Sequence, residues 1–124
     1  MKLKKLSASE FDRVARLTGM EQQTIDMARE VLVFGRKQTE IAAETGMTKQ
    51  RIFKAVLKIE QAYFNSESDG AALVSLDLNL PEKLALELAS ISAILESRAV
   101  TPSDMESIDV ALAALVKARQ ALQS

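Results

Sequence analysis

Residues Gln38–Ile59 of this 124-residue chain have the sequence QTEIAAETGMTKQRIFKAVLKI, which is its most informative pattern. Apolar residues recur at helical spacing on both sides of Gly46. This spacing predicts a short helix over 38–45 and a longer one that is capped by Thr48 and runs to about Asn65. Two helices joined by a short turn that contains glycine are typical of a helix-turn-helix.

The packing positions of this motif hold suitable residue types. Ala42 is small, so the second helix can cross close to it, and Gly46 can adopt the positive φ that the turn requires. We expect four apolar side chains to fill the space between the two helices: Ile41, Met47, Ile52 and Ala55. With Val56 and Ile59 also facing inward, the outward face of the second helix is mostly polar and basic.

The outward face has side chains suited to reading DNA, so we expect this helix to lie in the major groove. Gln50 can bond the edge of adenine, and Lys49 or Lys54 can donate to guanine. Phe53 can contact a thymine methyl group, and Thr48 lies at the start of the same surface. The residues better placed for phosphates are Arg36, Lys37, Gln38, Arg51 and Lys58.

The charge of the chain is unevenly distributed. Residues 1–65 contain 12 Lys and Arg against 8 Asp and Glu, a net charge of +4, whereas residues 66–124 contain 4 against 9, a net charge of −5. Such asymmetry favours one half that meets a polyanion and one half that does not. The alternatives are a chance distribution and a helical hairpin with a solvated basic face.

The composition argues against several classes of function. The chain has no Cys and no His, which excludes disulfides, thiolate or imidazole metal sites, and Ser-His-Asp or Cys-His catalysis. It also lacks a Gly-rich phosphate loop and a paired-acid motif. We therefore expect no enzyme, no cofactor, no metal and no small-molecule ligand. Since no apolar stretch approaches the roughly 18 to 20 residues of a membrane span, we expect a soluble cytoplasmic protein with no membrane partner.

Helix-capping residues and a polar linker divide the chain into two parts. Ser7 and Glu10 form a capping-box pattern that starts a helix, and a second helix is predicted from about Glu21 to Phe34. The polar segment 65–70 lies where the charge changes sign. We therefore predict two domains, 1–65 as the DNA-binding domain and 66–124 as a second module.

In the second module the spacing of the apolar residues changes. Residues 74–80 alternate between apolar and polar, which predicts a half-buried strand, and Pro-led helices are predicted over about 81–98 and 102–122. A lone strand leaves backbone groups unpaired, and a second copy of the chain can satisfy them. The predicted fold is therefore mainly α, with an N-terminal helix-turn-helix domain and a C-terminal strand-helix-helix module like ribbon-helix-helix.

This module is predicted to dimerise and not to read DNA, because Asp77 on the outward side of the strand would repel phosphate. The alternative is that the strand pairs within its own chain. The predicted dimer-interface residues are Val74, Leu76, Leu78, Leu80, Leu84, Leu88 and Ile91.

Several short motifs extend the pattern over 6–64. They are Leu6-Ser7 with Glu10-Phe11, Gln22-Gln23-Thr24-Ile25 with Ala28-Arg29, Val31-Leu32-Val33 with Gly35, then Gln38, Gly46-Met47-Thr48 and Ala55-Val56. In these residues the chain resembles the KorA (TrfB) type of plasmid transcriptional repressor. The resemblance implies a dimeric repressor that binds a short palindromic operator. The family has small residues where Gln50, Arg51 and Phe53 stand, so the operator sequence does not carry over. The last helix, from Pro102, extends beyond a known member of the family.

The leading hypothesis is a dimeric, sequence-specific transcriptional repressor, plasmid-encoded, that binds a palindromic operator through a helix-turn-helix. Its partners would be double-stranded DNA and a second copy of itself. Two alternatives from other classes are a non-specific architectural DNA-binding protein and a protein-interaction adaptor that uses the motif only for packing. The acidic second half argues against the architectural protein, which needs a basic surface throughout.

Overall fold

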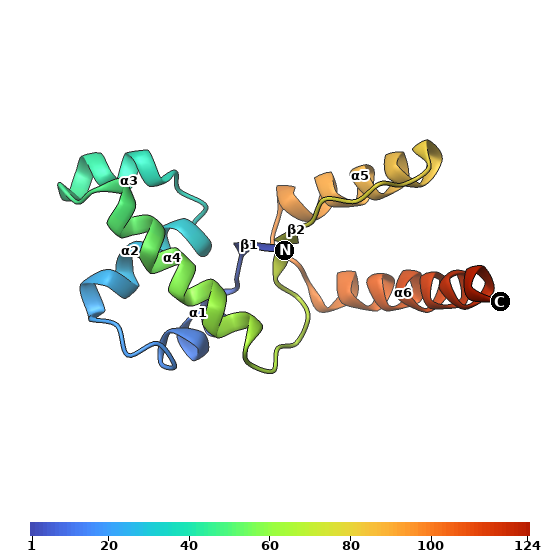
Figure 1. Cartoon of the computed structure of the whole chain (residues 1–124), viewed down its shortest axis with the longest axis horizontal. Coiled ribbons are helices and arrows are strands. Elements are labelled where there is room, and N and C mark those ends of the chain that lie inside the picture. Colours follow the sequence, from blue (N-terminus) through green and yellow to red (C-terminus); the bar gives the residue numbers. More distant parts are fainter. The chain divides into compact units, whose positions relative to one another are not determined.

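The computed structural model describes all 124 residues and is mainly helical, with one small two-stranded sheet. The chain forms two compact units, Met1–Leu78 and Asn79–Ser124 (Figure 1). In chain order the elements are β1 (Lys2–Lys5), α1 (Ala8–Ala15), α2 (Gln22–Leu32), α3 (Gln38–Thr45), α4 (Lys49–Phe64), β2 (Leu73–Ser75), α5 (Glu82–Ser97) and α6 (Pro102–Gln123).

The core of the first unit is built around α4, which packs against α1, α2 and α3 (Figure 1). Phe11 and Val14 of α1, Leu32 of α2 and Ile59 of α4 are almost fully buried. The remaining buried members of this main cluster are Leu3, Leu6, Ala15, Ala28, Ala55 and Tyr63. A smaller second cluster consists of Met27, Ile41 and Ile52.

The first strand is an element that the sequence pattern did not predict. β1 pairs antiparallel with β2, with Leu3 opposite Val74. The backbone N–H of Leu3 also donates to Oε2 of Glu60 at 2.9 Å, and the N–H of Leu6 donates to the carbonyl of Leu32 at 2.9 Å. The basic N-terminal segment is therefore part of the fold, with Leu3 and Leu6 in the core.

The strand predicted over 74–80 is shorter than expected and has its partner in the same chain. Only Leu73–Ser75 form β2, and 76–80 have no regular secondary structure. Because β1 already pairs with one edge of β2, the backbone groups of this strand do not require a second copy of the chain as a partner. The same pairing moves the division of the chain from the predicted position after residue 65 to a position after Leu78.

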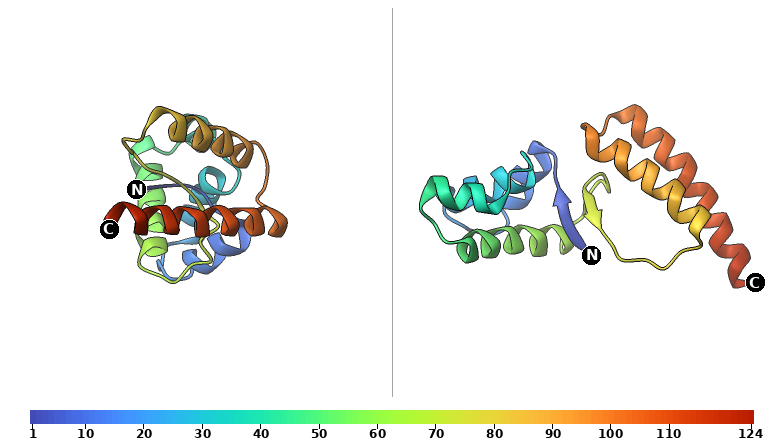
Figure 2. Two further views of the ribbon diagram at one scale, coloured as in Figure 1. Left: turned by 90° about the vertical axis from the view of Figure 1, so that its right-hand side faces the viewer. Right: turned by 90° about the horizontal axis from the view of Figure 1, so that it is seen from above.

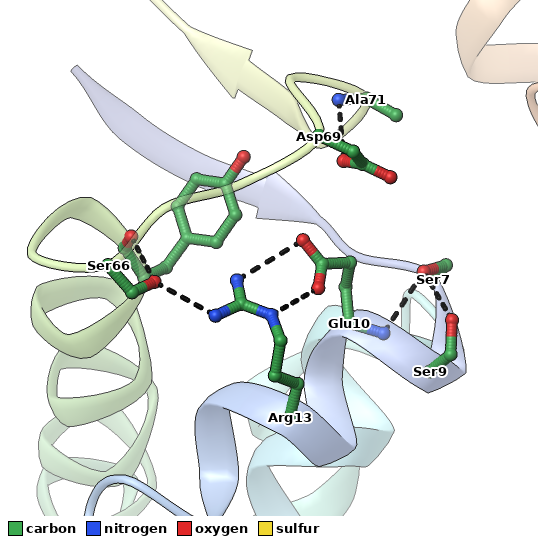
Figure 3. A network of polar contacts seen from close by, with 8 residues as sticks. Ser7, Ser9, Glu10, Arg13, Ser66, Asp69 and Ala71 are labelled. Atoms are coloured by element: carbon green, nitrogen blue, oxygen red, sulfur yellow. Dashed lines mark hydrogen bonds and ion pairs between the residues drawn. The ribbon is translucent and has the colours of Figure 1, made fainter.

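A network around Arg13 joins α1 to the residues that follow α4 (Figure 3). Ser7 caps α1 by accepting from the N–H of Glu10 at 3.2 Å, but the predicted capping box is only half formed. The Glu10 carboxylate instead pairs with Arg13, which lowers the pKa of Glu10. Nη1 of Arg13 also donates to Oγ of Ser66 at 3.3 Å, and that hydroxyl donates to the carbonyl of Tyr63 at 2.9 Å.

The second unit is a helical hairpin in which α5 and α6 run in opposite directions (Figure 2). Thr101 and Asp104 form a complete capping box at the start of α6, with Pro102 in the first turn as predicted. Asp104 also pairs with Arg98, and this hydrogen bond holds the pKa of Asp104 well below its usual range. No residue of either helix is buried, so this unit has no core of its own within one chain.

Candidate nucleic-acid interface

Two helices and a tight turn form the predicted functional region, here called the α3–α4 unit (38–64). Gly46 has φ of 72°, and its N–H donates to the carbonyl of Ala42 at 3.0 Å, which closes α3. The hydroxyl of Thr48 accepts from the N–H of Arg51 at 3.2 Å and begins α4. The prediction of both helices and of the glycine turn is confirmed to within about one residue at each end.

The space between these helices is filled largely as predicted. Ile41 and Ile52 are 1% and 0% exposed and pack with Met27 of α2. Ala42 and Met47 are half-buried against this cluster. The exception is Ala55, which faces the main core and not α3. Ala55 lies on the same side of α4 as Ile59, four residues further on, which packs in the same cluster.

The outer surface of α4 carries most of the predicted DNA-contacting residues. Phe53 is 54% exposed, although its ring is apolar. The other predicted contacts that are exposed are Lys37, Thr48, Lys49, Gln50, Arg51, Lys54 and Lys58, and Gln38 is half-buried. Gln61, which is not among the predicted contacts, lies on the same side of α4 as Gln50 and Lys54 and is also exposed. Its spacing of seven residues from Lys54, two helical turns, was the available signal.

The basic residues of this surface have no carboxylate partner in the chain. The protein forms no salt bridge with any of the five residues Lys37, Lys49, Arg51, Lys54 and Lys58. Arg51, Lys54 and Lys58 lie within about 60° of one another around α4, and such a group of unneutralised cations attracts a polyanion such as the phosphate backbone.

Arg36 is bonded differently from the other basic residues. Its Nη1 lies 3.4 Å from Oε2 of Glu30, its Nε lies 3.8 Å from Oε2 of Glu40, and its Nη2 contacts Oε1 of Glu44. The hydrogen bond between Arg36 and Glu44 raises the pKa of Arg36 and lowers that of Glu44. The sequence predicts a phosphate contact here, whereas the structure gives Arg36 three carboxylate partners on α2 and α3.

The predicted dimer-interface residues fall on both sides of the division after Leu78. Val74, Leu76 and Leu78 are 38%, 54% and 59% exposed. Leu84 and Ile91 of α5 are 36% and 40% exposed. Leu80 and Leu88 are half-buried.

The structure shows no cluster of acidic residues that could hold a metal ion. None of the helices combines the length and the apolar character needed to span a membrane.

Comparison with known proteins gives a consistent picture. The family model described as KORA, TrfB plasmid transcriptional repressor, matches residues 6–90. One Escherichia coli protein named TrfB transcriptional repressor protein is 39% identical over 56 residues, which is 45% of this chain and 56% of that protein. A second with the same name is 33% identical over 82 residues, 66% of this chain and 69% of that protein. The match includes α1 to α4, β2 and the first half of α5, and the chain belongs to the TrfB family of plasmid transcriptional repressors.

Proposed function

We propose that this repressor binds DNA through the α3–α4 unit, used as a helix-turn-helix with α4 in the major groove. The observation that supports this most directly is the outer face of α4, where Gln50, Phe53 and Lys54 are exposed beside several basic side chains without carboxylate partners. A folded helix that presents amide, aromatic and cationic groups together has the chemistry of base-edge and phosphate contacts.

The exposed residues divide into two roles by their position on α4. Gln50, Phe53 and Lys54 lie near the N-terminal end on the outward side, so we assign them to base edges. Arg51 and Lys58 lie toward the flank and are assigned to phosphates. At the starts of α3 and α4, the proposed DNA-binding surface is completed by Lys37, Gln38, Thr48 and Lys49.

The second unit supplies the proposed homodimer. Leu86 and Ile94 of α5 and Leu112 of α6 are 61%, 54% and 55% exposed, and exposed apolar residues gathered on two helices form a surface of the kind that another protein surface covers. A unit without a single buried residue cannot offset its loss of conformational entropy alone.

In this proposal the predicted interface residues of 74–91 face a second copy. A two-fold dimer presents two copies of α4, so the operator is an inverted repeat with half-site centres about 34 to 36 Å apart. The protein would act in the cytoplasm, where plasmid DNA is transcribed.

Selection of bound sites from a random DNA pool tests the proposed function. The intact protein should enrich one inverted-repeat sequence and bind it far more tightly than random DNA at the same salt concentration. Binding without an enriched sequence would indicate the architectural alternative. No DNA binding at all would favour the protein-interaction adaptor.

A further inference from the structure

The strand β1 carries positive charges that the proposed DNA-binding surface does not include. Three of its four residues are lysines, namely Lys2, Lys4 and Lys5. None of the three forms a salt bridge within the protein. Cations that are concentrated in this way and are not neutralised attract a polyanion.

The backbone of β1 turns two of these lysines away from the core. Leu3 is 6% exposed and packs in the main cluster, whereas Lys2 and Lys4 on either side of it are exposed. Because successive side chains of a strand point to opposite faces, Lys2 and Lys4 project together from the face opposite Leu3. Lys5 follows an irregularity in the pairing with β2 and is half-buried.

The strand is held beside the C-terminal half of α4. The backbone N–H of Leu3 donates to Oε2 of Glu60 at 2.9 Å. In both views of Figure 2 the start of β1 lies level with α4, on the side of the first unit where α4 forms the surface. The exposed lysines of β1 therefore extend the outer surface of α4 beyond its last turns.

The separation along α4 is close to the width of the DNA groove. Glu60 lies ten residues beyond Gln50, which is about 15 Å at a rise of 1.5 Å per residue. The major groove is about 12 Å wide and is bordered by the phosphate backbones. When the N-terminal turns of α4 enter the groove, the second half of the helix and the neighbouring β1 come to the level of the bordering backbone.

The basic residues of the first unit divide into two groups by their partners. Arg13, Arg29 and Arg36 all pair with carboxylates and join elements of the fold. No lysine of this unit is paired in this way, and the Glu60 carboxylate that bonds β1 accepts from the backbone. The lysine charges of β1 are therefore available to an external polyanion.

We propose that β1 is a second phosphate-binding element, in which Lys2 and Lys4 contact the DNA backbone that borders the groove occupied by α4. This inference rests on the proposed function, because it requires α4 in the major groove. Lysine contacts with phosphodiesters add affinity and fix the docking of α4 without reading bases. A two-fold dimer presents two such strands, one at each half-site.

The double variant Lys2→Gln with Lys4→Gln, made in the full-length chain, tests the contact on the selected operator. Each lost phosphate contact lowers the slope of log affinity against log salt by about 0.9. A dimer that loses one contact per chain should therefore change its slope by about 1.8, and one that loses two by about 3.6. The sequence enriched from a random pool should stay the same, because no base contact is removed.

Two further variants separate a phosphate contact from other effects of the substitutions. Lys83→Gln with Lys117→Gln removes the same charge from exposed residues of the second unit and should leave the salt slope nearly unchanged. Lys2→Arg with Lys4→Arg keeps the charge and should keep both the affinity and the slope. Circular dichroism shows whether each variant keeps its helices.

Ethylation of single operator phosphates gives a direct second measurement. Some phosphates bordering the half-sites should block binding of the unmodified protein when ethylated but have no such effect on the Gln double variant. Those phosphates are the ones that β1 contacts.

The outcomes separate this inference from the proposed function. An unchanged salt slope in the Gln double variant, an equal change in the control pair, or an identical set of interfering phosphates would overturn the β1 contact alone. Operator selection and its dependence on Gln50 would then still stand. Failure of the unmodified protein to enrich any operator would contradict the proposed function and the β1 contact together.

Discussion

Arg36 connects α2 to α3 through carboxylates on both helices. Glu40 and Glu44 lie on α3, the helix that a helix-turn-helix places across the DNA backbone. Without Arg36 these carboxylates would repel one another and the phosphates. We therefore expect Arg36 to support DNA binding by holding and neutralising α3 and not by contacting a phosphate.

Replacing Arg36 by Gln should weaken operator binding, and adding Glu44→Gln should recover part of the loss. This recovery follows because the second change removes a carboxylate that the first leaves unpaired. Binding titrations at several salt concentrations measure both effects. If Arg36 contacts a phosphate, Arg36→Gln should instead lower the salt slope by about one unit, with no recovery in the double variant.

Gln50 and Arg51 are adjacent on α4 but are assigned different contacts. Gln50→Ala should cost about 1–3 kcal/mol on the operator and relax the preference at one position of each half-site. Arg51→Ala should weaken binding to every sequence and flatten the salt dependence. Equal losses on operator and random DNA for Gln50→Ala would contradict its assignment to a base.

At the scale of elements, local sequence patterns predicted the helices, but they did not predict the long-range pairing of the strands. Gly46, Thr48 and the apolar spacing around them were sufficient for α3 and α4, because capping and turn chemistry are local. β1 was missed because its partner lies about 70 residues away and its three lysines hide the core role of Leu3. The bonding of Arg36 depends on how two helices are placed, which spacing along one helix does not reveal.

The importance of β1 can be measured through Leu3. Leu3→Ala removes a side chain that is 6% exposed and should lower the free energy of unfolding of the first unit by about 2–4 kcal/mol. Leu17→Ala, at a residue 61% exposed and outside both proposed interfaces, is the matched control and should change it by less than about 0.5 kcal/mol. Urea denaturation measures both, and an equally small effect of Leu3→Ala would remove β1 from the core.

At the scale of the molecule, the two units have different requirements. The first has a core and the proposed DNA-binding surface, whereas the second has exposed apolar helices. Because β2 and the contacts of Ser66 belong to the first unit, a fragment that contains this unit alone should end at Leu78. A fragment ending at residue 65 loses the partner strand of β1 and should unfold at a lower urea concentration than the fragment 1–78, by circular dichroism.

In the proposed dimer, two linked copies of the first unit give tight, specific binding, and one titration tests this most directly. The affinity of fragment 1–78 and of the intact protein for the selected operator is measured at the same salt concentration. The fragment should bind near the non-specific range of about 10⁻⁴ to 10⁻⁶ M, and the intact protein about 10² to 10⁴ times more tightly. A monomeric fragment that binds the full operator as tightly as the intact protein would contradict the dimer mechanism.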